Sequence, residues 1–349
     1  MTESEIVRPP GHAIRLILSL VVLGIAALAA LLVGPVDLST GAVLRELADL
    51  LPFMDGSSGL SDQHSTILLE LRLPRVVLGG LVGATLALAG AAYQGVFRNP
   101  LADPYLLGVA AGAGLGATLA IAYVQGASGW PIDLVPVAAF AGAIVGVAAT
   151  YSLGRSGTRT RTTTSLVLAG VAVASFLTAV QTYIQQRESA TLRQVYTWIL
   201  GRLGTVGWDE VVLMLPYFVL SAAAILLHRR LLDVLSVGDE EAESLGVRTA
   251  RVRLVVVGAA TLGTAAAVAV SGLIGFVGII VPHAIRLMFG TSYRVVVPLS
   301  IILGAAFMIL TDLAARTAAA PAELPIGVIT AFLGAPFFVL VLRRTRRVV

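Results

Sequence analysis

The chain has 349 residues, of which 57% are hydrophobic and 13% are charged, and its net charge is +4. Soluble domains carry about 25% charged residues, so this composition predicts an integral membrane protein. It excludes a soluble enzyme, a disordered chain and a nucleic-acid-binding protein. The sequence has no cysteine, which excludes disulfides, thiolate metal sites and cysteine nucleophiles. Every basic residue is an arginine, so the lysine of a Walker A loop is absent and the chain is not a P-loop ATPase by itself.

Apolar stretches of the length that crosses a bilayer core of about 30 Å recur along the whole chain. We predict ten spans, at residues 16–33, 76–93, 105–124, 134–153, 164–184, 211–227, 254–271, 274–289, 295–315 and 326–342. The uncharged stretch 254–285 is too long for one ordinary crossing, and we place a break at Ser271-Gly272. The first span is longer than the apolar core of a signal peptide, so we expect a retained helix. The predicted class is an all-α polytopic membrane protein.

The arginines are distributed unevenly between the predicted loops. If the N-terminus lies in the cytosol, ten crossings return the C-terminus there, and most of the arginines face the cytosol, including the run 343–347. This distribution follows the positive-inside rule. We therefore predict that both termini are cytoplasmic.

Polar residues are rare within the predicted spans. Asp312 and Arg316 are spaced to pair on one helix face, but no chain of buried acids or histidines and no serine–histidine–acid set is evident. The four histidines are scattered, so we predict no metal site and no cofactor. This pattern favours a wall or channel over a catalyst. The competing hypotheses are an ion-coupled secondary transporter, which predicts buried acids at the membrane midplane, and a membrane-embedded enzyme, which requires polar catalytic residues in the spans.

Two hydrophilic features stand out. The inner loop 228–253 is predicted to form two short helices hinged at Gly238, with Asp239, Glu240 and Glu241 opening the second helix. Its apolar positions suggest a docking segment, and the alternative is an ordinary solvated loop. On the outer side, Arg72 and Arg75 precede the second span against the charge bias. They either anchor the span to lipid headgroups or receive carboxylates of a docking partner.

Glycines at four-residue spacing, such as Gly108, Gly112 and Gly116, predict closely packed helices.

Several longer motifs together resemble one known family, the FecCD-like permease subunits of bacterial ABC importers for iron–siderophores, haem and vitamin B12. The motifs are Arg-Leu-Pro-Arg (72–75), Gly-Ala-Thr-Leu-Ala-Leu-Ala-Gly (83–90) with Gln94, Asn-Pro-Leu-Ala-Asp-Pro (99–104), Gly-Phe-Val-Gly-Ile-Ile-Val-Pro-His (275–283), Glu-Leu-Pro-Ile-Gly-Val-Ile-Thr (323–330) and Gly-Ala-Pro-Phe-Phe (334–338). The similarity runs from about residue 14 to residue 347.

The resemblance implies one transmembrane permease domain over residues 1–349 with the type II importer fold. It also implies a second permease subunit, identical or paralogous, two ATP-binding cassette subunits and an extracytoplasmic substrate-binding protein. The implied location is the inner membrane of a bacterium, and ATP hydrolysis is expected on a separate chain, so the permease itself is not an enzyme.

The resemblance also assigns roles to individual residues. It implies that Arg72, Arg75 and Arg316 meet acidic residues of the binding protein. The implied ATPase-coupling segment includes Leu235, Gly238, Asp239, Glu240, Glu241, Leu245 and Gly246. The implied cytoplasmic gate lies at Asn99 and Leu101, after the second span, and at Thr163 and Thr164, where the fifth span starts.

Overall fold

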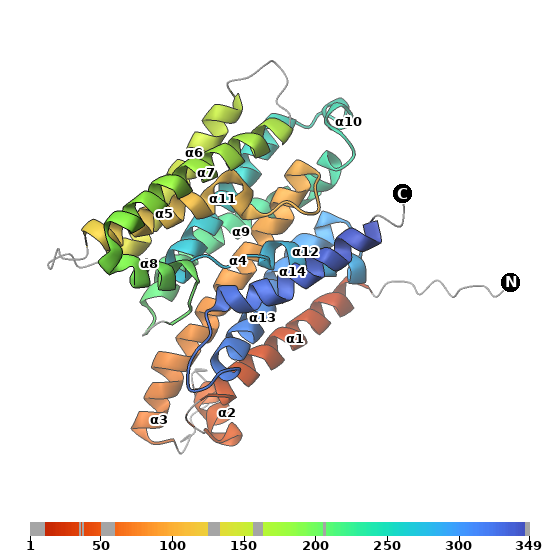
Figure 1. Ribbon diagram of the computed structural model, residues 1–349. Helices are drawn as coiled ribbons and strands as arrows, with labels where there is room; N and C mark the ends of the chain where they lie inside the picture. The colour runs from red at the N-terminus through yellow and green to blue at the C-terminus, as the bar shows by residue number, and fades with distance from the viewer. Residues whose placement is uncertain are drawn as a thin grey trace.

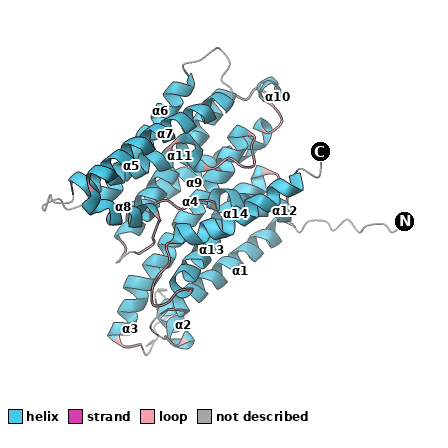
Figure 2. Cartoon of the chain, viewed as in Figure 1, coloured by secondary structure: helices cyan, strands magenta, loops and turns pink. Residues whose placement is uncertain are grey.

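The structure is a computed structural model that describes residues 11–34, 36, 38–49, 60–124, 133–155, 163–204 and 207–345. Within these ranges every regular element is helical and no strand occurs (Figure 2). The all-α prediction is therefore confirmed, and the long helices run roughly alongside one another (Figure 1).

Each of the ten predicted spans corresponds to a helix within the described ranges. These helices are α1 (His12–Leu32), α4 (Leu73–Phe97), α5 (Val109–Tyr123), α6 (Leu134–Arg155), α7 (Thr163–Arg187), α9 (Asp209–Leu235), α11 (Thr249–Ser271), α12 (Val277–Phe289), α13 (Tyr293–Thr317) and α14 (Ile326–Thr345). Seven of the described helices are long and apolar enough to cross a membrane alone, whereas α5, α12 and α14 are shorter apolar helices.

The connecting segments contain shorter helices. They are α2 (Thr40–Asp49), α3 (Asp62–Thr66), η1 (Ile67–Arg72), η2 (Pro104–Leu107), η3 (Ser189–Thr191), α8 (Leu192–Ile199) and α10 (Asp239–Ser244). Because α3 and η1 run directly into α4, this helix begins well before the predicted start at residue 76. The prediction of two short helices in the loop 228–253 is wrong for the first of them, because α9 continues unbroken to Leu235 and only α10 is separate.

Helix α4 is the central helix of the fold. It packs against α9, α11, α12 and α13, and 83% of the most apolar window of the continuous helix 62–97 is buried, against 22% for α7. Glycines permit this packing: a Cβ atom on Gly90 would lie 2.1 Å from the carbonyl oxygen of Gly278, and one on Gly83 would lie 2.2 Å from that of Gly304. Helices α12 and α13 therefore touch α4 backbone to backbone.

Helices α5, α6 and α7 pack together on one side of the molecule, and α1 packs against α13 on the other (Figure 1). The predicted glycine spacing explains the α5–α6 contact. A Cβ atom on Gly112 would lie 2.2 Å from the oxygen of Gly142, and one on Gly116 would lie 2.0 Å from the oxygen of Ala138. Any side chain at these positions would separate the two helices.

The predicted break between the seventh and eighth spans is confirmed. Helix α11 ends at Ser271, Gly272 has a φ of +71°, and α12 begins only after Phe276, whose φ is +68°. The interrupted backbone needs other hydrogen-bond partners away from water. The hydroxyl group of Tyr105 supplies them, since it donates to the oxygen of Ile274 and accepts from its amide, both at 3.0 Å.

Candidate functional site

Arg75 and Arg316 belong to a charged cluster at one end of the bundle. Arg75, in the first turn of α4, donates from Nη2 to Asp312 at 2.9 Å and to Glu323 at 2.9 Å. Arg316 Nε lies 3.1 Å from the other oxygen of Asp312, as the spacing of four residues predicted. Two arginines and two acids therefore share one network, which we call the outer cluster (Arg75, Asp312, Arg316 and Glu323).

The members of the outer cluster differ in exposure. The side chain of Asp312 is 3% exposed, and that of Glu323 is 54% exposed. Glu323 lies in the connection between α13 and α14, and its hydrogen bond to Arg75 holds the pKa of this carboxyl below its ordinary value of 4.5, against the opposing effect of partial burial. Glu323 is thus a charged, accessible partner of Arg75.

Arg72 lies apart from the outer cluster and is buried. Its guanidinium group donates to the carbonyl oxygens of Leu31, at 2.7 Å, Leu32, at 3.2 Å, and Val36. Arg316 also donates to Ala30 in the last turn of α1, at 3.0 Å. These arginines donate hydrogen bonds to carbonyl groups at the end of α1 that have no donor within the helix. Their positive charges also compensate the negative end of the helix dipole. The structure thus gives Arg72 a role in fixing α1 onto α4.

The implied coupling segment forms a turn and one short helix at the other end of the bundle. Asp239 opens α10 and accepts hydrogen bonds from Arg98 and Arg253, each at 2.6 Å. Leu235 is buried at the end of α9. Gly238 precedes α10, and Gly246 follows it with a φ of +80°, a conformation that favours glycine.

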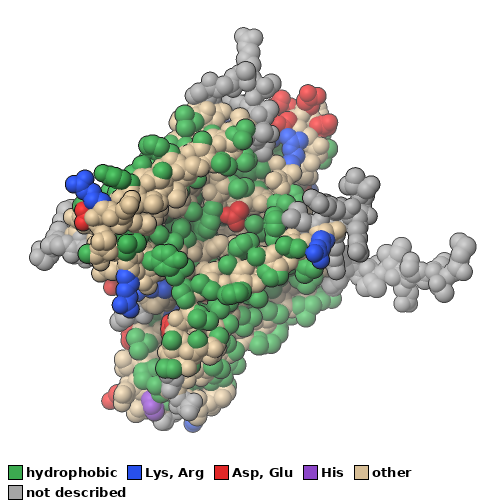
Figure 3. All heavy atoms as spheres, viewed as in Figure 1, with side chains coloured by type: hydrophobic (Ala, Val, Ile, Leu, Met, Phe, Trp, Pro, Cys, Tyr) green, Lys and Arg blue, Asp and Glu red, His purple; other side chains and the backbone are tan. Residues whose placement is uncertain are grey.

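The outer surface of this segment is both apolar and acidic. Val237 and Leu245 are each 71% exposed, and Glu240 and Glu241 are exposed between them. The acidic side chains form a visible group over α10 (Figure 3). These apolar side chains are exposed at the end of the bundle, away from the lipid-facing helices. Large exposed apolar side chains in such a place are typical of a protein contact surface.

Two of the implied gate residues directly follow Arg98, the partner of Asp239 in this segment. Arg98 ends α4 in the left-handed conformation, with a φ of +50°, and Asn99 and Leu101 form the turn that follows. The side-chain oxygen of Asn99 accepts a hydrogen bond from the amide of Leu101 at 2.9 Å, which stiffens the turn. Thr163 and Thr164 start α7, and their side chains lie outside the described residues.

Gln94 links this turn to α12. Its side-chain amide donates to the carbonyl oxygens of Gly278, at 2.8 Å, and Ala102, at 3.3 Å, and its oxygen accepts from Arg286. The sequence motifs that contain Gln94 and Gly278 therefore contact each other where α4 meets α12. Sequence reasoning did not assign this role, because the two residues are 184 positions apart.

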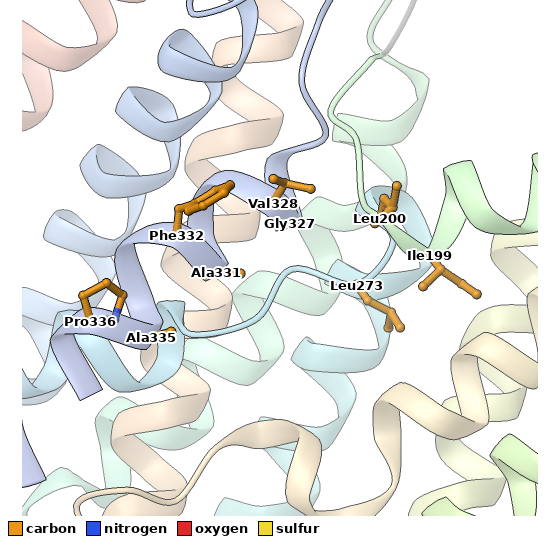
Figure 4. A pocket seen from close by; sticks show the side chains of 9 residues that line it. All are labelled: Ile199, Leu200, Leu273, Gly327, Val328, Ala331, Phe332, Ala335 and Pro336. Atoms are coloured by element: carbon orange, nitrogen blue, oxygen red, sulfur yellow. The ribbon is translucent and has the colours of Figure 1, made fainter. Parts of the chain in front are cut away.

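An apolar cavity of about 600 Å³ opens between α8, α14 and the linker 272–276 (Figure 4). Its lining includes Ile199 and Leu200, Leu273 of the linker, and Val328 and Phe332 of α14. Phe332 is 74% exposed. Among the residues that the structure describes, no three His, Asp or Glu side chains come together in a way that would hold a metal ion.

Sequence reasoning missed several members of these sites. Glu323 and the Asp239 partners Arg98 and Arg253 were not predicted to take part. The position of Arg98 directly after α4 could have marked it as a candidate for an ion pair. The sequence does not show that Asp239 is its partner.

An apolar helical bundle of this length, with charged clusters at its two ends and a broken helix beside a cavity, defines a multi-pass membrane permease. The sequence profile of the FecCD transport family matches residues 20–344. The cobalamin import system permease protein BtuC of Halobacterium salinarum is 42% identical over 285 residues, which cover 82% of this chain and 75% of that protein. The hemin transport system permease protein HmuU of Yersinia pestis is 39% identical over 307 residues, 83% of this chain and 87% of the relative.

Among solved structures, an inward-facing metal-chelate type ABC transporter matches with a TM-score of 0.80 and 28% identity, over 94% of this chain and 98% of that one. The chain belongs to the FecCD transport family. It is a permease subunit of an ABC importer, which works with a partner permease and with separate ATPase subunits, and it is not itself an enzyme.

Proposed function

We propose that this permease imports an iron–siderophore, haem or a cobalamin-type chelate, which an extracytoplasmic binding protein delivers. Two named relatives transport cobalamin and hemin, and the similar solved structure is of metal-chelate type. The apolar cavity of about 600 Å³ beside α14 supports a large ligand and a path between two permease subunits, identical or paralogous. Within this proposal, residues 1–349 act as one permease domain.

One observation carries the mechanism: α4 joins the two charged sites. Arg75 of the outer cluster lies in its first turn, and Arg98, which holds Asp239, follows its last residue. Arg98 follows Arg75 by 23 positions, which corresponds to about 35 Å of helix at 1.5 Å per residue, enough to cross the hydrocarbon core. A rigid, buried helix thus connects a site for an external partner with a site for an internal one.

We assign docking of the binding protein to the outer cluster. Arg75 and Arg316 offer cationic groups to acidic residues, and Glu323 occupies Arg75 until a stronger partner displaces it. Arg72 contributes by holding the end of α1 in place rather than by direct contact, since its guanidinium group is buried against α1. This refines the expectation that all three arginines contact the partner.

We assign ATPase coupling to the segment from Leu235 to Gly246. Val237 and Leu245 supply the apolar contact, and Glu240 and Glu241 supply charge. Asp239 transmits movement, because its pairs with Arg98 and Arg253 link α10 to the ends of α4 and α11. The adjacent turn, with Asn99 and Leu101, and the start of α7 at Thr163 and Thr164 form the cytoplasmic gate.

This assignment sets the orientation of the chain in the inner membrane. The start of α1 lies with the end of α12 through a hydrogen bond from Arg15 to Phe289, while the end of α1 contacts the outer cluster. The start of α1 is therefore at the same end of the bundle as α10. With the ATPase in the cytosol, the N-terminus is cytoplasmic, and ten crossings return the C-terminus to the same side, which agrees with the arginine bias of the sequence.

The substitution Asp239→Asn tests the coupling assignment. We expect ATP-driven uptake by the permease, reconstituted with its ATPase and binding protein, to fall about fivefold, the equivalent of about 1 kcal/mol for the two surface ion pairs of Asp239 together. ATP hydrolysis should continue, because the apolar contact surface is unchanged. Asp209→Asn, which removes an exposed acid at the other end of α9, is the matched control. If uptake per ATP hydrolysed is equal in both variants and wild type, Asp239 does not couple the subunits.

A further inference from the structure

A second cavity, of about 320 Å³, lies between the start of α1, the end of α9 and the start of α13. Its size falls at the lower end of the range of about 300–1,000 Å³ that is usual for small-molecule sites. Four arginines line it, and its described lining includes no carboxylate: Arg15, Arg229, Arg230 and Arg294. We call it the basic cavity. None of the roles assigned above uses it.

Three of the four arginine charges in the basic cavity are weakly compensated within the described residues. The side chains of Arg229 and Arg230 make no hydrogen bond or ion pair within the part of the chain that the structure describes. Arg294 Nε lies 3.6 Å from Asp233, a long distance for an ion pair. The carboxylate of Asp233 is already engaged, since it accepts hydrogen bonds from the amide of Tyr293 at 2.6 Å and from the hydroxyl of Ser292 at 2.9 Å.

Backbone electrostatics add to the positive potential. Arg294 is the second residue of α13 and Arg15 is the fourth residue of α1. Cations at these positions face the positive ends of two helix dipoles, an arrangement that is unfavourable unless an anion is near. Arginine forks are the groups that bind phosphate with two parallel hydrogen bonds. A phosphate group in the basic cavity would offset these charges.

The other walls of the basic cavity are apolar and continue onto a lipid-facing surface. Leu16, Val295, Pro298 and Leu299 complete its lining. The neighbouring turns of α1 expose a run of large aliphatic side chains: Ile14, Ile17, Leu18, Val21 and Ile25. Inorganic phosphate gains nothing from contact with such an apolar surface, whereas the acyl chains of a phospholipid would pack against it.

We propose that the basic cavity binds the phosphate-bearing headgroup of an anionic phospholipid, with the acyl chains lying along α1. In the proposed orientation this is a lipid of the cytoplasmic leaflet. Basic pockets between transmembrane helices at this leaflet suit anionic headgroups. The bound lipid ties α1 to the ends of α9 and α13, close to the segment that leads into α10.

Native mass spectrometry of the full chain in mild detergent tests this proposal. The probes are phosphatidylglycerol, phosphatidylcholine with matched chains, and inorganic phosphate. We expect preferential binding of phosphatidylglycerol. In the double variant Arg229→Gln/Arg230→Gln its affinity should fall about 25-fold, from about fivefold for each arginine. The double variant Arg229→Lys/Arg230→Lys should lose less affinity than the Gln variant, because its charge remains, but it should not reach the wild-type affinity, because lysine lacks the arginine fork.

The double variant Arg248→Gln/Arg251→Gln is the matched control, since it removes two exposed arginines at the same end of the bundle. It should bind phosphatidylglycerol like the wild type. Equal binding of both lipids, equal losses in the two Gln double variants, or displacement of the lipid by millimolar inorganic phosphate would each overturn the proposal. Because lipid binding is the readout, its failure would leave the transport proposal untouched.

Discussion

Asp312 shows how single side chains decide the properties of the outer end. Its carboxylate is almost fully buried and touches two guanidinium groups, those of Arg75 and Arg316. Removal of one partner from a buried charge network lowers folding stability by about 3–5 kcal/mol, whereas the loss of a surface pair lowers it by at most about 1 kcal/mol. Asp312 therefore fixes both arginines in position, and Glu323 is the exchangeable member of the cluster.

This arrangement predicts opposite effects for two neutral substitutions on binding-protein affinity. Arg75→Gln should weaken binding about two- to fivefold, because a surface charge pair is worth up to about 1 kcal/mol. Glu323→Gln should strengthen binding by a similar factor, because Arg75 loses its internal competitor. Both effects should increase at low ionic strength, where screening is weaker. Titration of the reconstituted permease with its binding protein at two salt concentrations measures them.

Two variants that bind like the wild type at low salt would remove the outer cluster from the docking surface. The pH dependence of binding-protein affinity checks the same role of Glu323. Since the pKa of Glu323 lies below 4.5, its pair with Arg75 is present at neutral pH and is lost only as the pH falls through that lowered value. Competition by Glu323 is therefore constant across the pH range in which binding is measured.

At the scale of helices, the fold depends on pairs that meet at glycine. Helices α5 and α6 approach at Gly112 and Gly116, and α4 approaches α12 at Gly90. The same positions leave no room for a Cβ atom, so the interhelical distance is fixed by backbone contact. We therefore expect each pair to move as a rigid body during transport, with changes at helix ends such as the turn after α4.

A pair of alanine substitutions tests the contact between α5 and α6. Gly116→Ala should lower stability by about 1–3 kcal/mol, the usual cost of overpacking, because the new methyl group would lie 2.0 Å from the oxygen of Ala138. Gly258→Ala should be neutral or stabilising by up to about 1 kcal/mol, since no atom lies within 4 Å and alanine favours helix. Thermal unfolding in detergent compares the two variants. Equal midpoints would contradict the proposed role of the glycines.

For the whole molecule, the source of energy distinguishes the importer from an ion-coupled transporter. The ion-coupled alternative requires titratable groups within the spans, and the buried acid Asp312 is instead neutralised by two arginines at the outer end. The family assignment places ATP hydrolysis on separate subunits. The chain is therefore the permease part of the importer, and the two docking sites are the roles that we propose for its charged ends.

Vesicle uptake tests this division of work. The permease reconstituted alone should not concentrate the chelate, and addition of its ATPase, ATP and loaded binding protein should start uptake. A protonophore or removal of sodium should leave the ATP-driven rate unchanged. Accumulation by the permease alone in an ion gradient would establish the ion-coupled alternative instead.

Hydropathy, glycine and span length act locally along the chain, so the membrane class, the ten helices and the break at Ser271-Gly272 were predictable from the sequence. Charge spacing within one helix likewise predicted the Asp312–Arg316 pair. The extension of α9 to Leu235 and the burial of Arg72 against α1 became known from the packed structure. It alone paired Arg98 with Asp239, 141 positions apart, and Arg75 with Glu323, 248 positions apart. Such partners depend on which helix ends meet in the packed bundle, and no local pattern of residues records that.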